Sequence, residues 1–420
     1  MAHLEYISFR AHRSHIENGE LTWRSDAHQD LVGLPAICWE DGEPWREANL
    51  WFRTNVHALD LDTVRTRARA IYAYAKWLEQ TSTDWWDFPI KEEDRCLVRY
   101  RGFLIKNRDA GRLAPSLATT RMRVAIMFYR WLTSSMLLSP EWPMWRERIV
   151  GIRVEDKFGF KRTIDVQSTN LAIPNRARKG VRLEGGLTPV SDSVRQQILE
   201  LANAECSQEL ALMLNLGFFT GMRLGTILDL KCRNLERAVL AYGSESLALL
   251  AVGPDASPPV RTKYSVSGKV WIPKALLDEL IAYCSSPRRV LREVKANKEN
   301  KDSVFLTKNG DPYASLIDGS SSAVNVEMSR LRKKAVQLGI THFRFHQTRA
   351  TFGTAVAEIA LALGSPNPVE LVREALLHRD EATSLKYIKF VKDSRTKSAL
   401  GNEFSRMFMG ALADRSLANA

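Results

Sequence analysis

Three basic side chains precede one tyrosine in the second half of this 420-residue chain. His346 and Arg349 lie in FRFHQTRATFGTA, while His378 and Tyr387 lie nine positions apart in LLHRDEATSLKYIKF. A further arginine, Arg223, lies upstream in TGMRLGTILDL. Arginine and histidine side chains bind phosphate oxygens, and a tyrosine hydroxyl can act as a nucleophile. The order Arg, His-x-x-Arg, His, Tyr therefore predicts a site that attacks a phosphodiester.

Two arginines are the predicted phosphate clamps. Attack on a phosphodiester adds negative charge to the non-bridging oxygens, so the site needs fixed cations whose donors match two oxygens at once. Arg223 and Arg349 fit because guanidinium is planar, permanently charged and bidentate. His346 precedes Arg349 by three positions, which places both on one face of a helix. An isolated His-x-x-Arg pattern is common, whereas the same pattern between TG-x-R and H-x8-Y is specific.

Tyr387 is the predicted nucleophile. A phenol whose pKa is about 10 is a poor nucleophile without a base or a cationic setting. His346 or the two arginines can supply that help. Each of these residue types, taken singly, is more often structural, so the order and spacing carry the catalytic interpretation. Tyr264, Tyr283 and Tyr313 lack such neighbours, and we expect them to be structural.

These motifs, in this order, resemble those of the tyrosine recombinase (phage integrase) family. The resemblance covers roughly residues 60–415, with specific motifs only from 220 to 390. It implies a mainly α fold with a small antiparallel β-sheet, in which a helical core-binding domain and a mixed α/β catalytic domain form a C-shaped DNA clamp. It also implies site-specific cleavage and rejoining of DNA through a 3′-phosphotyrosine, without metal, cofactor or ATP, in the service of a mobile element.

The resemblance also assigns roles to further residues. A lysine on a mobile β-turn protonates the leaving 5′-oxygen in this family; Lys263 in RTKYSVSGKVWIP is the preferred match, and Lys269 is the alternative. His378 would hydrogen-bond the scissile phosphate. Thr226 stands where an acidic residue is usual, three positions after the first arginine, and Leu377 replaces the usual glycine before the histidine.

The partners implied are double-stranded DNA, a homotetramer in the synaptic complex, and accessory DNA-bending or directionality proteins. Two other classes use or keep similar features. A type IB topoisomerase relaxes supercoils with similar tyrosine chemistry but without pairing two sites. A catalytically disabled, sequence-specific DNA-binding protein would keep the fold and lose the reaction.

Composition agrees with a polyanionic partner. Lys and Arg total 60 against 48 Asp and Glu, a formal net charge of +12. Each phosphate that a basic side chain neutralises releases a counterion, so such an excess favours DNA binding. At 420 residues and 45% hydrophobic content the chain can bury two cores.

Cysteine usage and hydropathy indicate a cytoplasmic protein. The five cysteines form no C-x-x-C pair, which argues against a disulfide frame or a zinc site. The N-terminus lacks a signal-peptide core, and no apolar run reaches the roughly 20 residues of a membrane span. The cysteines are Cys38, Cys96, Cys206, Cys232 and Cys284.

Hydrophobic periodicity predicts the elements that position these residues. Helices are expected over 62–78, 117–133, 194–203, 209–219, 224–230 and 324–338, and a short antiparallel sheet over 239–252 and 270–273. The predicted domains are an N-terminal arm of strands and turns or irregular structure (1–55), a helical core-binding domain (56–150), a basic linker (151–187), the catalytic domain (188–395) and a C-terminal tail helix (396–420).

The linker and the C-terminal tail each carry a pattern that predicts a contact. The linker carries a basic cluster that either follows a DNA backbone or is solvated; its members are Arg176, Arg178, Lys179 and Arg182. The tail carries an apolar stripe at helical spacing, expected to pack on a neighbouring protomer, with docking on its own domain as the alternative. The stripe consists of Phe404, Met407, Phe408, Ala411 and Leu412.

Overall fold

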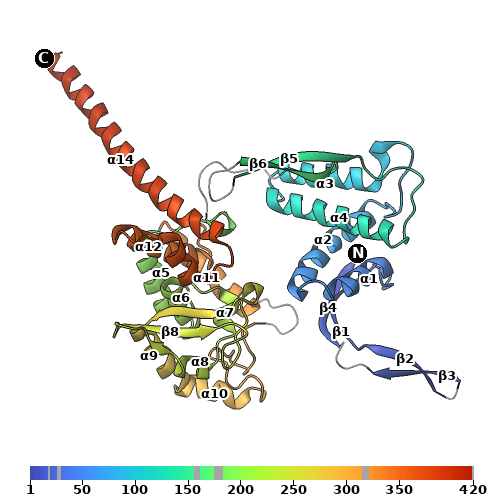
Figure 1. Cartoon of the computed structure of the whole chain (residues 1–420), viewed down its shortest axis with the longest axis horizontal. Helices are drawn as coiled ribbons and strands as arrows, with labels where there is room; N and C mark the ends of the chain where they lie inside the picture. The colour runs from blue at the N-terminus through green and yellow to red at the C-terminus, as the bar shows by residue number, and fades with distance from the viewer. Residues whose placement is uncertain (18, 26–29, 156–160, 175–182, 315–320, 419–420) are drawn as a thin grey trace. The chain divides into compact units, whose positions relative to one another are not determined.

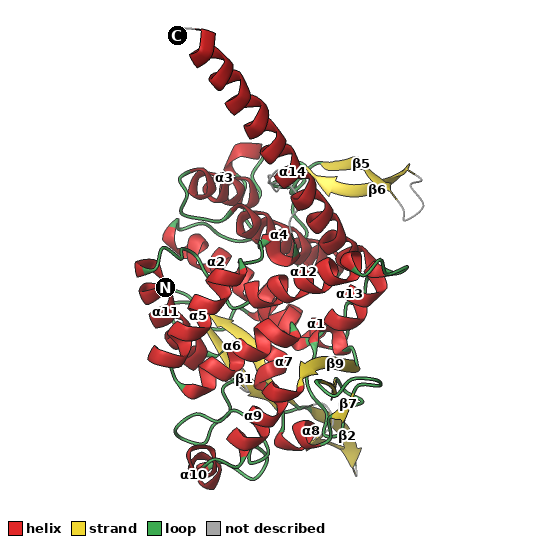
Figure 2. Ribbon diagram, turned by 90° about the vertical axis from the view of Figure 1, so that its left-hand side faces the viewer, coloured by secondary structure: helices red, strands yellow, loops and turns green. Residues whose placement is uncertain are grey.

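The chain divides into two compact units, one formed by residues 1–178 and the other by 179–315 with 319–420. Helices are the commonest elements in both units, and the strands pair antiparallel (Figure 2). The predicted fold class, mainly α with small antiparallel sheets in two domains, is confirmed. The computed structural model describes the whole chain except residues 18, 26–29, 156–160, 175–182, 315–320 and 419–420.

The first unit is a helical bundle with small antiparallel strand pairs, two of which come from its N-terminal residues (Figure 1). Its helices bury large aromatic and aliphatic side chains such as Ile71, Tyr74 and Phe128, as the helical periodicity predicted. The helices are α1 (Arg46–Val56), α2 (Leu61–Gln80), α3 (Cys96–Asp109) and α4 (Pro115–Ser134), with a 3-10 turn η2 (Glu92–Asp94). The strand pairs are β1 (His3–Phe9) with β4 (Leu31–Cys38), and β2 (His12–Glu17) with β3 (Glu20–Ser25).

The described residues between 1 and 55 include four strands and nearly all of α1. Strand β4 and helix α1 share a core with α2 and α4. The side chains buried in it include Ile37 of β4, Phe52 of α1 and Trp45, the N-cap of α1. The glycine and proline in LVGLPAIC suggested turns, yet both lie within β4. Burial of the surrounding apolar side chains outweighs their weak strand propensity.

The predicted linker begins inside a β-hairpin. Strand β5 (Glu147–Glu155) pairs antiparallel with β6 (Lys161–Thr169), with Val150 opposite Val166. β-branched residues favour strands, and the charges interleaved with them hid this pattern in the sequence. The basic cluster expected in the linker lies outside the described residues.

The second unit surrounds a three-stranded antiparallel sheet with helices. The sheet, in the order β7 (Val239–Leu240), β8 (Leu247–Val252), β9 (Gly268–Pro273), is the predicted one. The helices are η3 (Glu184–Gly186), α5 (Asp192–Glu205), α6 (Gln208–Thr220), α7 (Leu224–Leu228), α8 (Cys232–Glu236), η4 (Lys263–Ser265), α9 (Lys274–Cys284), α10 (Pro287–Lys295), α11 (Ser322–Gln337), α12 (Gln347–Ala362), α13 (Pro368–Leu376) and α14 (Glu381–Ala418). Among the described residues, no helix is long and apolar enough to cross a membrane.

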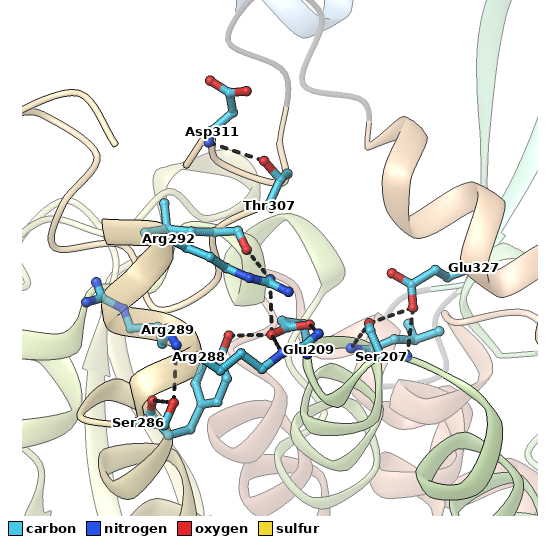
Figure 3. Close-up of polar contacts among 12 residues, drawn as sticks. Ser207, Glu209, Ser286, Arg288, Arg289, Arg292, Thr307, Asp311 and Glu327 are labelled. Carbon is cyan, nitrogen blue, oxygen red and sulfur yellow. Dashed lines mark hydrogen bonds and ion pairs between the residues drawn. The ribbon is translucent and has the colours of Figure 1, made fainter. Parts of the chain in front are cut away.

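A buried ion network fixes the start of α6. Glu209, which is fully buried, accepts hydrogen bonds from Arg288 at 2.8 and 2.9 Å and from the Tyr283 hydroxyl at 2.8 Å. Arg292 lies 3.0 Å from the same carboxylate, and Figure 3 shows Arg288 and Arg292 beside Glu209. Burial alone would raise the pKa of Glu209, but these cationic and hydroxyl donors lower it. The network ties α6 to α9 and α10.

The end of α6 turns at Gly221. This residue is left-handed, with φ of 66°, and ends the helix two positions before Arg223. A Cβ here would lie 2.4 Å from the Phe352 ring, so both the backbone angle and the packing require glycine. The turn directs the chain into α7 with Arg223 at its N-cap.

Candidate active site

All six predicted catalytic residues lie in the second unit. Arg223 is the N-cap of α7, and His346 is the N-cap of α12, with Arg349 in the first turn of that helix. His378 follows α13, and Tyr387 lies on α14. The turns and helix ends of this unit therefore carry the predicted phosphate-binding groups.

One carboxylate brings four of these groups together. Oε2 of Glu184, in η3, accepts a hydrogen bond from Arg223 Nη2 at 3.3 Å and lies 3.6 Å from His346 Nε2. Oε1 accepts hydrogen bonds from Arg349 Nε and Nη2, both at 3.4 Å, and from His378 Nε2. The site thus holds one monoanion by both of its oxygens.

Sequence analysis did not identify Glu184. Its partners lie between 39 and 194 positions away along the chain, and no local pattern marks it. Burial alone would raise the pKa of Glu184, but the neighbouring His346, the hydrogen bond from His378 and the charge of Arg349 hold it well below its usual range. The carboxylate is therefore ionised at neutral pH.

Arg349 is built into the site before any substrate arrives. Its side chain is only 3% exposed, and its Nη1 and Nη2 donate to the carbonyl oxygens of Gly221 and Leu376, each at 2.8 Å. Burial lowers its pKa, and Glu184 opposes that shift. Nε and Nη2 also face the anion, so one guanidinium joins the turn after α6, the end of α13 and the bound carboxylate.

His378 has a defined proton position. Burial, followed by the charge of Arg349, lowers the pKa of His378, and the hydrogen bond to Glu184 opposes this shift. Because a carboxylate only accepts, Nε2 must carry a proton, and Nδ1 lies 2.9 Å from the Ser384 hydroxyl. Nε2 is therefore a donor directed at the anion.

The Tyr387 side chain is completely buried. Its ring lies 5.8 Å from the His378 ring, centroid to centroid, and a Cβ on Gly353 of α12 would lie 2.6 Å from it. Its hydroxyl makes no hydrogen bond with any described residue. Burial raises the pKa of Tyr387, the negative Glu184 raises it further, and the two arginines oppose this. In this conformation the phenol is held neutral.

Lys263 lines a small cavity together with the two arginines, Arg223 and Arg349, and Lys269 does not line it. Lys263 belongs to η4, the turn before β9, while Lys269 is exposed on β9 itself. Next to Lys263, Tyr264 is 67% exposed and has a positive φ of 64°.

The two departures from the family pattern have structural counterparts. Leu377 is left-handed, with φ of 49°, a conformation that costs a non-glycine residue about 1–2 kcal/mol. Its side chain packs so closely that a Cβ on Gly268 would lie 2.4 Å from it, and this packing offsets the strain. Thr226 is buried in α7, and it is Glu184 that contacts Arg223.

The site can stabilise a monoanion beside a tyrosine. It offers two guanidinium groups, one buried imidazole donor and a second, half-exposed imidazole. Among the described residues, no group of three His, Cys, Asp or Glu side chains is placed to hold a metal ion.

Comparison with known proteins gives likeness in structure alone. No family model and no curated protein matches the chain. A Tn1549 transposon integrase in complex with circular intermediate DNA is 13% identical, with a TM-score of 0.47 over 81% of this chain and 94% of that one. A lambda integrase dimer bound to a COC′ core site is 14% identical, with a TM-score of 0.48 over 82% and 93%. XerA recombinase is 15% identical, with a TM-score of 0.34 over 84% and 96%.

These solved structures are integrases and a recombinase. Because identity and TM-score are both low, the functional conclusion rests on the residues of the site and their geometry.

Proposed function

We propose that this chain is a tyrosine recombinase that cleaves and rejoins double-stranded DNA at specific sites through Tyr387. One observation carries the proposal: Arg223, Arg349, His346 and His378, from separate parts of the sequence, converge on a single anion beside a tyrosine. The chemistry predicted from residue order alone requires this convergence. An integrase of a mobile element is the role that the family resemblance implies.

The phosphate-binding groups act on charge that develops in the transition state. With the scissile phosphate in the place of the Glu184 carboxylate, Arg223 and Arg349 hold its non-bridging oxygens and His378 Nε2 donates to one of them. Arg349 needs no reorganisation because two backbone carbonyls already fix its guanidinium. His346, half-exposed at the start of α12, is the candidate base for the phenol.

The bond changes balance without an external energy source. The Tyr387 oxygen bonds to phosphorus and loses its proton, while the bond from phosphorus to the 5′-oxygen breaks. Lys263 supplies a proton to that leaving oxygen. The phosphotyrosine is again a diester, so a 5′-hydroxyl from another strand can reverse the step and rejoin DNA. Lys263 is preferred to Lys269 because it lines the cavity beside both arginines.

Assembly into a tetramer on two DNA duplexes is part of the proposal, and α14 supports it. Ile388 and Val391 are buried, but from Lys392 to Leu400 every described side chain is exposed. The helix continues to Ala418 and projects away from the rest of its unit (Figure 1). A solvated helix gains little stability without a packing partner, which favours docking on a neighbouring protomer. Accessory DNA-bending or directionality proteins remain implied by the resemblance alone.

The test is the formation of a covalent protein–DNA adduct on nicked duplexes. Wild-type protein should form an adduct that resists denaturation by detergent, and Tyr387→Phe should abolish it, because only the attacking oxygen is removed. DNA binding by the variant should be nearly unchanged. An undiminished adduct in Tyr387→Phe would sink the assignment.

The same samples separate the alternative classes. Relaxation of a supercoiled plasmid that carries no recombination site would indicate a type IB topoisomerase. DNA binding without any adduct would indicate a disabled DNA-binding protein.

A further inference from the structure

The Glu184 carboxylate occupies the place that the proposed function gives to DNA phosphate. We infer that Glu184 is a built-in competitor of the scissile phosphate, so that the free protein is autoinhibited until its η3 segment withdraws. This inference rests on the proposed function for the identity of the displacing anion. The occupied anion site itself is independent of that function.

The chemistry of the two anions is matched. A carboxylate and a phosphodiester each carry one negative charge and offer two oxygens to the surrounding donors. Glu184 uses both oxygens, one toward Arg223 and His346 and the other toward Arg349 and His378. A second anion cannot share these donors, since like charges in contact repel strongly in a partly buried site. Binding of phosphate therefore requires the carboxylate to leave.

The carboxylate is delivered by an anchored segment. Leu183, directly before it, is 3% exposed and packs in the small core that contains Ala350 and Tyr387. On the other side, the Thr188 carbonyl accepts a hydrogen bond from Gln347 Nε2 at 3.2 Å. The Val190 amide donates to Thr351 Oγ1 at 3.0 Å. Both anchors are on the catalytic unit, so Glu184 is not a surface side chain that happens to reach the site.

The predicted nucleophile, Tyr387, is also held in an inactive position. Tyr387 is buried without a hydrogen bond to any described residue, and it shares its core with Leu183. Withdrawal of the segment that bears Glu184 would remove Leu183 from that core as well. Release of the anion site and loosening of the tyrosine are therefore linked through two adjacent residues.

A different role for Glu184 predicts the opposite result. Thr226 lacks the acidic group expected beside Arg223, and Glu184 could replace it as a positioning residue. A positioning acid would orient one arginine and stay in place when DNA binds. Glu184 instead contacts both arginines and both histidines, which leaves the phosphate without donors. Removal of its charge should therefore activate the enzyme, whereas removal of a positioning acid would slow it.

The first measurement uses inorganic phosphate and needs no DNA. Full-length wild type, Glu184→Gln and the matched control Glu374→Gln are melted over a range of phosphate concentrations. Glu374 is an exposed acid on α13 of the same unit, so its replacement removes the same charge outside the site. A ligand that binds only the folded state raises the melting temperature by mass action.

Glu184→Gln should reach a given rise in melting temperature at a phosphate concentration at least about tenfold lower than wild type, because the variant no longer places a competing negative charge among the four donors; tenfold in affinity corresponds to about 1.4 kcal/mol. The control should follow wild type. Equal or weaker phosphate binding by Glu184→Gln overturns the inference. Glu184→Ala provides the same comparison if the glutamine variant does not fold.

The second measurement is the rate of adduct formation on a pool of nicked duplexes of randomised sequence. Glu184→Gln should form the Tyr387 adduct faster than both wild type and Glu374→Gln. A slower adduct, whatever the phosphate affinity, identifies Glu184 as a positioning residue and overturns the inference. If Glu184→Gln binds phosphate more tightly than wild type but neither wild type nor any variant forms an adduct, the proposed function is wrong. The inference that Glu184 competes with a bound anion is then still supported.

Discussion

Arg223 and Arg349 hold the same carboxylate, but their other contacts differ. Arg349 is 3% exposed and also satisfies the buried carbonyl oxygens of Gly221 and Leu376. Arg223 is 24% exposed, and its side chain contacts Glu184. Replacement of either arginine should therefore slow the reaction, whereas only replacement of Arg349 should also destabilise the fold.

We predict that Arg223→Ala and Arg349→Ala each slow adduct formation by at least about 10²–10³, the usual effect of deleting a preorganised transition-state donor. Arg349→Ala should also lower the free energy of unfolding by about 1–3 kcal/mol for each carbonyl that loses its partner. Arg223→Ala should change it by less than about 0.5 kcal/mol. Urea unfolding and adduct rates measure the two effects.

Lysine in place of either arginine should not restore the rate, because an ammonium group offers a point charge without the planar fork. Near wild-type rates for Arg223→Lys and Arg349→Lys would contradict their role as phosphate clamps.

Lys263 is predicted to protonate the leaving 5′-oxygen. Lys263→Ala should lose cleavage of ordinary DNA but regain it on a duplex whose scissile bond has a 5′-sulfur, since a thiolate leaves without a proton. Lys269→Ala, the matched control on β9, should cleave both substrates at similar rates. If the 5′-sulfur substrate restored cleavage by Lys269→Ala and not by Lys263→Ala, Lys269 would be the general acid.

At the scale of elements, the Glu209 network positions the helix that leads to Arg223. Glu209 is fully buried and contacts Arg288, Arg292 and Tyr283. Removal of one partner from a buried ion pair leaves uncompensated charge, so Glu209→Ala should lower the free energy of unfolding by about 3–5 kcal/mol. Glu200→Ala, at an exposed position of α5, is the control and should change it little. A comparable loss in both variants would show that the network does not stabilise the unit.

The elements that could be predicted from sequence are those with local patterns. Helices α2, α4, α5 and α6 follow apolar periodicity, and the catalytic motifs lie in short contiguous segments whose order is visible without a structure. Burial of β4 was not predictable, because its glycine and proline suggested turns and only tertiary packing overrides them.

Glu184 was missed for a different reason. Its contacts join η3 to residues up to 194 positions away, so no window of sequence contains both an acid and its partners. Leu377 occupies a left-handed position at which the family pattern expects glycine. Packing against Gly268 compensates for its backbone strain, and this long-range contact is not visible in the sequence.

At the scale of the whole molecule, α14 is the part most suited to contact another protomer. We predict that truncation after residue 400 leaves DNA binding by single protomers intact but abolishes synapsis and recombination. Tyr387, Ile388 and Val391 keep their buried positions in such a variant, so the catalytic unit should fold normally. Light scattering of protein–DNA complexes gives the number of protomers. If the truncated protein recombined paired sites at the full rate, the tail would not couple protomers and would only pack on its own unit.

The most direct test of the central claim is to map the residue that becomes attached to DNA. Adduct from wild-type protein is digested with a protease and a nuclease, and the modified peptide is sequenced by mass spectrometry. The proposed mechanism predicts a single nucleotide linked through phosphate to Tyr387, a modification that Tyr387→Phe cannot form. Attachment to any other side chain, such as the exposed Tyr264 beside Lys263, would contradict it.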